Sequence, residues 1–172
     1  MPSLREYLST ITKIACSLNG PKVEATVAAA LRDTLCPRAG VSASAGFAAV
    51  AGTLRLAVVP ATTDARTLHP GLEGKKNWML VRIANGMEIL TNREHLLYGL
   101  FTMVNEEWRD TDVAAFRDGK ILIPAFPEVR PVFDLFLTQW GRNARSLNRE
   151  EHVRNMARMG NSCVEVNGLA FH

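Results

Sequence analysis

The chain has 172 residues, of which 47% are apolar and 22% are charged, and its formal net charge is +3. This composition is typical of a globular protein that contains one domain, or one domain and part of another. The positive charge comes from scattered arginines without a basic run, so nucleic acid is not an expected partner.

Three cysteines, Cys16, Cys36 and Cys163, lie far apart, and no CxxC pair occurs. Neither a zinc site nor a disulfide framework is therefore expected, and we predict no metal and no cofactor. The amino terminus carries charged residues such as Arg5 and Glu6, unlike a secretory signal, and no apolar stretch approaches the roughly 20 residues of a membrane helix. We expect no membrane contact and a cytoplasmic location, or secretion if a further segment precedes Met1.

The first third of the chain predicts two strands and one helix. Residues 1–10 form a polar lead-in, and residues 11–18 alternate well enough for an edge strand. Residues 22–35 place apolar side chains at helical spacing among alanines, which predicts an amphipathic helix. The small residues of 38–52 indicate a loop or a weak strand, and residues 54–59 predict a strand.

The middle of the chain predicts a hairpin. Residues 61–76 are rich in Thr, Gly, Pro and charge, which favours a surface loop. Two apolar runs, 78–83 and 87–90, follow and are separated by Asn85-Gly86, a strong hairpin signal. We therefore expect two antiparallel strands here.

Asn92 is the predicted N-cap of a second helix that runs to Trp108. Residues 110–119 then form a polar linker, and residues 120–123 a short strand. Together these elements predict an α+β fold. Residues 11–118 are expected to form a small, mostly antiparallel sheet of about four strands with both helices on one face.

We divide the chain into an accessory α+β domain at 1–120, a Pro-rich linker at 121–131 and a βαβ unit at 132–172. In the last unit, Val132 to Trp140 predicts a buried strand, Asn148 caps a helix, and residues 162–166 predict a second strand. The two strands should be parallel with a right-handed crossover. A lone βαβ unit leaves apolar surface uncovered, so we expect self-association, docking against the face of the N-terminal domain or, if the unit begins a barrel, docking to the missing portion of that barrel.

The candidate binding residues follow these two strands. Trp140, Arg142 and Arg145 come after the first strand, and Asn167 comes after the second. Ligands bind at the carboxyl ends of parallel strands, where Trp140 could contact a sugar ring and the arginines could donate to hydroxyls or carboxylates. Alternatively, Trp140 belongs to the core and the arginines are solvated loop residues. The expected ligand is carbohydrate, bound weakly if at all.

The segment LVRIANGMEILTNREHLLYGLFTMVNEEW, residues 80–108, resembles the small α+β domain that precedes the catalytic barrel of β-N-acetylhexosaminidases and α-glucuronidases. In that domain a hairpin leads into a helix of the form Gly-Leu-x-Tyr-Gly-Leu-x-Thr-Leu, whose second half LYGLFTM, residues 97–103, matches. IPAFPEVRPVFDLFLTQW is similar to the linker and first barrel strand of these enzymes, and NREEHVRNMARMGNSCVEVNG to the first barrel helix and second strand.

The resemblance implies the N-terminal portion of a glycoside hydrolase of carbohydrate metabolism, with residues 132–172 as the start of a (β/α)8 barrel. The parent enzyme would hydrolyse glycosidic bonds with paired carboxylates on later barrel strands. This chain then holds no catalytic residue and should be inactive alone. Two alternatives remain: a non-catalytic binding or assembly module that docks a partner through its exposed βαβ edge, or an unrelated small α/β enzyme with a site at Arg142 and Asn167.

Overall fold

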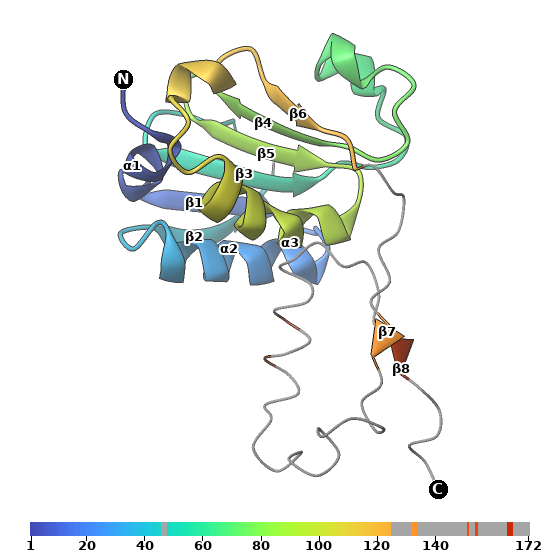
Figure 1. The fold of residues 1–172 in the computed structure, drawn as a ribbon, viewed down its shortest axis with the longest axis horizontal. Helices are drawn as coiled ribbons and strands as arrows, with labels where there is room; N and C mark the ends of the chain where they lie inside the picture. Colours follow the sequence, from blue (N-terminus) through green and yellow to red (C-terminus); the bar gives the residue numbers. More distant parts are fainter. Residues whose placement is uncertain (46–47, 125–131, 134–150, 152–153, 155–164, 167–172) are drawn as a thin grey trace, which may run out of the picture.

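The computed structural model describes residues 1–45 and 48–124, together with 132–133, 151, 154 and 165–166. The first 124 residues form an α+β sandwich in which helices cover one face of a six-stranded mixed sheet (Figure 1). The sheet has the order β2-β1-β3-β5-β4-β6. Its strands are β1 (Lys13–Ser17), β2 (Gly40–Ser44), β3 (Thr53–Val58), β4 (Met79–Ile83), β5 (Met87–Thr91) and β6 (Lys120–Leu122).

The expectation of a mostly antiparallel sheet of about four strands is wrong. β1 pairs in parallel with both β2 and β3, and β3 pairs in parallel with β5, whereas β4 is antiparallel to β5 and β6. β1 is also an interior strand rather than an edge strand. The consecutive burial of Ile14, Ala15 and Cys16 fits a strand covered on both faces.

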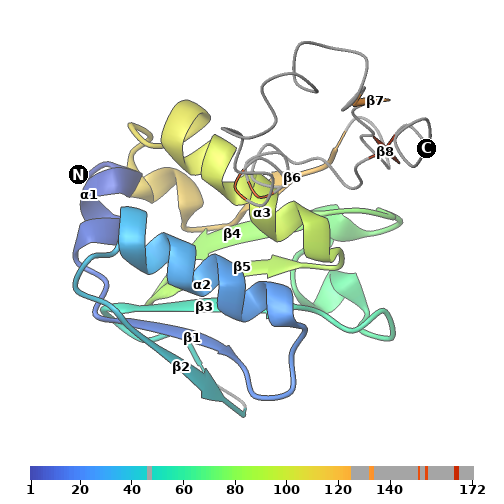
Figure 2. The same cartoon turned by 90° about the horizontal axis from the view of Figure 1, so that it is seen from below.

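Both long helices pack on the same face of the sheet, as the sequence predicts (Figure 2). α2 (Lys22–Thr34) buries Val23, Val27 and Leu31 at helical spacing. α3 (Glu94–Thr102) continues into a π-helical turn, η3 (Met103–Glu107). Their apolar side chains share one core with β1, β3, β4 and β5.

Two local predictions are wrong. The amino-terminal lead-in contains α1 (Leu4–Ser9), which a capping box of Ser3 and Glu6 begins and whose Leu4 and Leu8 are fully buried. Arg93, not Asn92, is the N-cap of α3. The Asn92 side chain instead accepts from the backbone N–H of Trp78 at 3.0 Å, so it ties the start of β4 to the end of β5.

Further short elements interrupt the predicted loops. The 61–76 segment contains the 3-10 helices η1 (Ala65–Thr67) and η2 (Pro70–Leu72), and the 110–119 linker contains η4 (Val113–Phe116). Leu72 and Phe116 are fully buried and anchor these segments to the two faces of the sheet. Among the described residues, no helix has the length and apolar character needed to cross a bilayer.

Beyond residue 124 the structure describes two short strands, β7 (Val132–Phe133) and β8 (Glu165–Val166), which pair in parallel. This pairing is the one predicted for the βαβ unit. Glu151 and Arg154, from the predicted intervening helix, are helical. The candidate residues Trp140, Arg142, Arg145 and Asn167 lie outside the described residues, so their proposed roles stay predictions.

Candidate ligand-binding site

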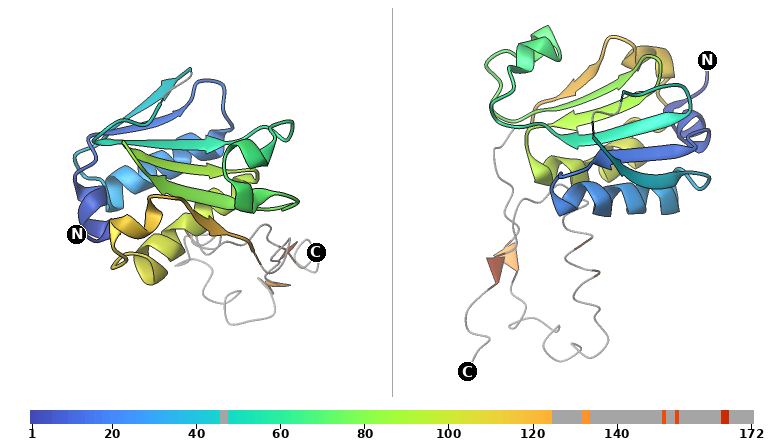
Figure 3. Two further views of the ribbon diagram at one scale, coloured as in Figure 1. Left: turned by 90° about the horizontal axis from the view of Figure 1, so that it is seen from above. Right: turned by 180° about the vertical axis from the view of Figure 1, so that it is seen from behind.

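Three charged residues form a row across the sheet face that α2 and α3 do not cover, the face nearest the viewer in the left view of Figure 3. Arg55 on β3 is the register partner of Glu88 on β5, and Glu88 is in turn the register partner of Arg82 on β4. Because strand residues alternate between faces, each lies between neighbours that point into the helix-covered core. We call Arg55, Glu88 and Arg82 the charged row.

Glu88 is the acceptor at the centre of the charged row. Arg82 Nε donates to Glu88 Oε2 at 3.1 Å, and Arg82 Nη2 donates to the same oxygen. Arg55 Nη1 donates to Glu88 Oε1 at 3.3 Å. The side chain of Glu88 is only 15% exposed, so the two guanidinium groups replace much of its hydration.

The charged row is the floor of a hollow with a volume of about 510 Å³. Small side chains and a turn complete its walls: Ala48 and Ala49 from the β2–β3 connection, and Ala84, Asn85 and Gly86 from the β4–β5 hairpin. The hollow therefore lies over the beginning of β3 and β5. This position differs from the carboxyl strand ends where the sequence argument placed a site.

Gly86 brings two of these walls together. The predicted hairpin is present, with Ile83 opposite Met87, but Gly86 does not have a positive φ. A Cβ at Gly86 would come closer than 3.0 Å to backbone atoms of Ala49 and Val50. Glycine is required here by the close approach of the β2–β3 connection, not by left-handed turn geometry.

A second hollow of about 200 Å³ adjoins the same arginine. Arg55 lines it together with the ends of β1 and β2, including Ser17, Asn19 and Ser44. Arg55 therefore lines both hollows, and its side chain is 36% exposed.

Glu24, on the first turn of α2, joins the carboxyl ends of β1 and β3 from the helix side. It is 1% exposed, and its carboxylate accepts from the backbone N–H groups of Ser17 and Val58, each at 2.7 Å. The Ser17 hydroxyl donates to it at 3.2 Å. Because these bonds satisfy backbone donors at the strand ends, Glu24 has a structural role.

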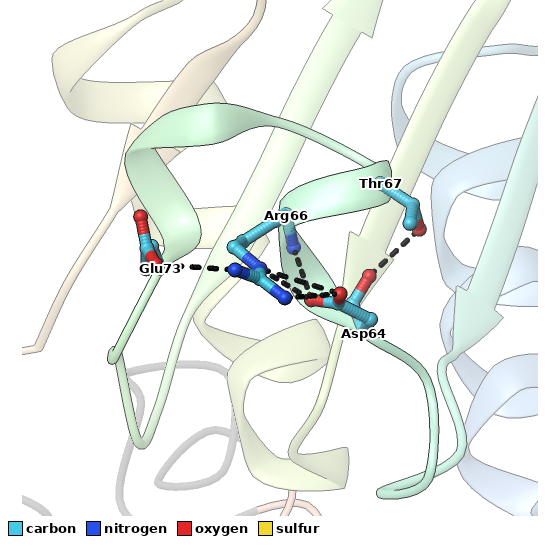
Figure 4. A network of polar contacts seen from close by, with 4 residues as sticks. All are labelled: Asp64, Arg66, Thr67 and Glu73. Atoms are coloured by element: carbon cyan, nitrogen blue, oxygen red, sulfur yellow. Dashed lines mark hydrogen bonds and ion pairs between the residues drawn. The ribbon is translucent and has the colours of Figure 1, made fainter.

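A second polar network lies within the segment that connects β3 and β4 (Figure 4). The Asp64 carboxylate accepts from the guanidinium and the backbone N–H of Arg66, and these bonds lower the pKa of Asp64. Arg66 also donates to Glu73 at 3.4 Å, and Thr67 donates to the Asp64 carbonyl. All four side chains lie on an exposed turn, so this network shapes the segment that carries η1 and η2 rather than a cavity.

The described cysteines are buried in the helix-covered core. Burial raises the pKa of Cys16 to about 11, with a smaller contribution from the Glu24 carboxylate, and burial raises the pKa of Cys36 to about 12. Both thiols are therefore protonated near neutral pH and unsuited to nucleophilic chemistry. In the described part of the chain, no cluster of three or more His, Cys, Asp or Glu residues could hold a metal.

The charged row does not provide general acid–base chemistry of the glycosidase type. Glu88 is the single carboxylate among the residues that line the two hollows described above. Glycoside hydrolysis needs two carboxyl groups roughly 5–10 Å apart across the bond, and one of them must carry a proton. The arrangement of one carboxylate between two arginines is suited to binding instead.

Sequence reasoning missed the charged row, although a signal was present. Each of the three apolar strand segments contains one charged residue: Arg55 in LRLAVV, Arg82 in LVRI and Glu88 in MEIL. Charged residues are rarely fully buried, so a single charge inside an apolar strand segment indicates that one face of the strand is not fully covered. The register that aligns these three residues depends on strand pairing across the sheet.

No protein-family model matches the chain, and comparison with curated proteins finds no relative.

Proposed function

We propose that the chain is the N-terminal, non-catalytic portion of a glycoside hydrolase. In this proposal residues 1–120 form an accessory α+β domain, and residues 132–172 begin a (β/α)8 barrel. The observation that carries the proposal is the fold of residues 80–108. They form strand, hairpin turn, strand and helix, with that helix on the same face as α2, which is the arrangement that the resemblance implies.

The carboxy-terminal strands support the second half of the proposal. β7 and β8 pair in parallel, Val132 with Glu165 and Phe133 with Val166, as neighbouring strands of a barrel do. In the sequence, residues 123–131 separate this pair from β6, the last strand of the six-stranded sheet. A continuation of the barrel would supply the paired carboxylates that hydrolysis requires.

Activity measurements test the proposal. The purified chain should not hydrolyse aryl β-N-acetylglucosaminides or aryl α-glucuronides, because no described hollow pairs two carboxylates. The product of the full open reading frame that contains this sequence should hydrolyse one of the two classes. Turnover by the 172-residue chain that Glu165→Gln abolishes would contradict the proposal, as would a full product inactive on both classes.

The hollow over Arg55 favours a second candidate function, that of a non-catalytic binding module. Its floor is polar, its walls are small, and its volume of about 510 Å³ falls within the range of about 300–1,000 Å³ typical of small-molecule sites. A binding module would retain its ligand affinity whether or not the full product has hydrolase activity. Binding and hydrolysis assays therefore distinguish the two functions.

A further inference from the structure

We propose that the hollow over the charged row binds a small hydroxylated anion, whose carboxylate or phosphate pairs with the guanidinium of Arg55. This inference does not depend on the glycoside hydrolase proposal, because it concerns binding by the sheet domain alone.

The charge of the row favours an anion. Two guanidinium groups face one carboxylate, so Arg55, Glu88 and Arg82 carry a net charge of +1 in a partly enclosed hollow. Glu88 is already paired on both oxygens, by Arg55 on Oε1 and by Arg82 on Oε2. The remaining attraction is therefore available to a ligand of opposite charge.

The two arginines differ in how many of their donors are used. Arg82 directs Nε and Nη2 to Glu88 and Nη1 to the Leu68 carbonyl at 3.3 Å, so all three of its nitrogens are engaged. Arg55 uses only Nη1 in the hydrogen bonds of the described residues. Its Nε–Nη2 edge offers two parallel N–H donors, the geometry that binds a carboxylate or phosphate through two oxygens.

Glu88 also orients Arg55 before a ligand arrives. The two residues are register partners on adjacent parallel strands, so the ion pair holds the guanidinium against the rigid sheet. A donor fixed in this way loses less conformational entropy on binding than an arginine on a mobile loop. Glu88 is thus a positioning residue for Arg55.

The walls limit the size and chemistry of the ligand. Ala48, Ala49, Ala84 and Gly86 leave space beside Arg55, and Asn85 adds an amide that can donate to or accept from a hydroxyl. A monosaccharide acid or a sugar phosphate combines an anionic group with hydroxyls at this size. Carboxylate and phosphate share the pairing with Arg55, so the experiment must separate them.

The test is a titration of the intact 172-residue chain in which NMR of the backbone amides and of the arginine Nε–H groups monitors binding. Glucuronate, glucose 6-phosphate and neutral glucose are the three probes. We expect saturable shifts at Arg55 Nε–H and at the amides of Gly86 and Glu88 with at least one anion, a Kd on the order of 1 mM, and no saturable shift with glucose. The anion that binds more tightly identifies the anionic group.

Matched variants locate the binding. Arg55→Gln should raise the Kd of the anion at least about tenfold. Arg66→Gln removes the same charge from the exposed network of Figure 4 and should leave this Kd unchanged. Arg55→Lys keeps the charge without the paired donors and should give an intermediate affinity. This variant also keeps the test valid if Arg55→Gln disturbs folding, which circular dichroism would report.

Three results would overturn the proposal. The first is the absence of saturable shifts with both anions. The second is equal weakening by Arg55→Gln and Arg66→Gln, which would show attraction by net charge alone. The third is binding of glucose as tight as that of either anion.

Discussion

The two faces of the central strands have opposite chemistry, although the same short segments build both. On β3, Leu54 and Leu56 point into the core beneath α2 and α3, whereas Arg55 between them lies on the other face. On β5, Met87 and Ile89 belong to that core and Glu88 does not. Within each of these strands, the side chains of one face form the apolar core and those of the other face are polar.

The face that α2 and α3 do not cover is itself divided. At one end, Leu72 from η2 covers Trp78, Leu80 and Leu90 in a small second apolar cluster. At the other end the charged row is exposed to the hollow. The turn that Asp64 and Arg66 stabilise belongs to the same segment as η2, whose Leu72 packs on this end of the face (Figure 4).

The largest expected difference between the faces is at adjacent residues of β3. Leu56→Ala should lower the free energy of unfolding by about 2–5 kcal/mol, because the fully buried side chain leaves a cavity under the helices. Arg55→Ala should cost less than about 1 kcal/mol, because its ion pair is partly exposed. Urea denaturation measures both values, and similar costs would contradict the division between the faces.

A smaller effect is expected where the helix face meets the strand ends. Glu24→Ala should lower the free energy of unfolding by about 3 kcal/mol, because the N–H groups of Ser17 and Val58 would lose their acceptor. Glu94 is the matched control, an exposed glutamate in the first turn of α3, and Glu94→Ala should cost less than about 1 kcal/mol. Equal losses in thermal or urea unfolding would show that Glu24 acts only through the helix dipole.

In the β4–β5 hairpin, Gly86→Ala should lower the free energy of unfolding by about 1–3 kcal/mol, because the added methyl group forces the backbone of Ala49 and Val50 to move. Gly40→Ala adds the same group to β2, where no atom lies within 4 Å, and should change stability by less than about 0.5 kcal/mol. The amide shifts of residues 48–50 should change in the first variant only. Unchanged shifts in Gly86→Ala would refute the close approach.

The smallest effect near neutral pH concerns the thiols of the helix face. Because the pKa of Cys16 is raised from 9.0 to about 11, folding favours its protonated form. The resulting stabilisation is complete below pH 9 and is lost as the pH rises through 11. Iodoacetamide at pH 8 should label Cys16 and Cys36 slowly in the folded chain and rapidly in denaturant, as site-resolved mass spectrometry would show. Rapid labelling of the folded chain at either site would contradict their burial.

The sequence predicted the elements whose pattern is strong and local. The helix at 22–35 has a regular apolar stripe, and the hairpin at 78–90 has a turn signal between two apolar runs, and both are present. α1 was missed because it has only six residues, and β2 was poorly defined because its sequence, GVSAS, is small and weakly apolar. The parallel pairing of β1 with β2 and β3 depends on contacts between distant segments, which no local pattern encodes.

The candidate site, too, could be predicted only in part from the sequence. Arg55, Arg82 and Glu88 are each visible as a charge within an apolar strand, but their alignment follows only from the β3-β5-β4 register. The predicted site residues Trp140, Arg142, Arg145 and Asn167 lie outside the described residues and stay predictions. The sequences of β3, β4 and β5 each show one charged residue, whereas the order of the strands in the sheet decides which charged residues meet.

The close approach of Val50 to Gly86 has a consequence for how this fold could diversify. The strands supply the floor of the hollow, including Arg55, whereas residues 48–49 supply one of its walls from a connection outside the sheet. Connections between strands tolerate insertions and substitutions far better than the strands themselves. Changes in this connection could therefore alter which molecules enter while the anchoring guanidinium stays in place, so that selectivity evolves separately from the scaffold.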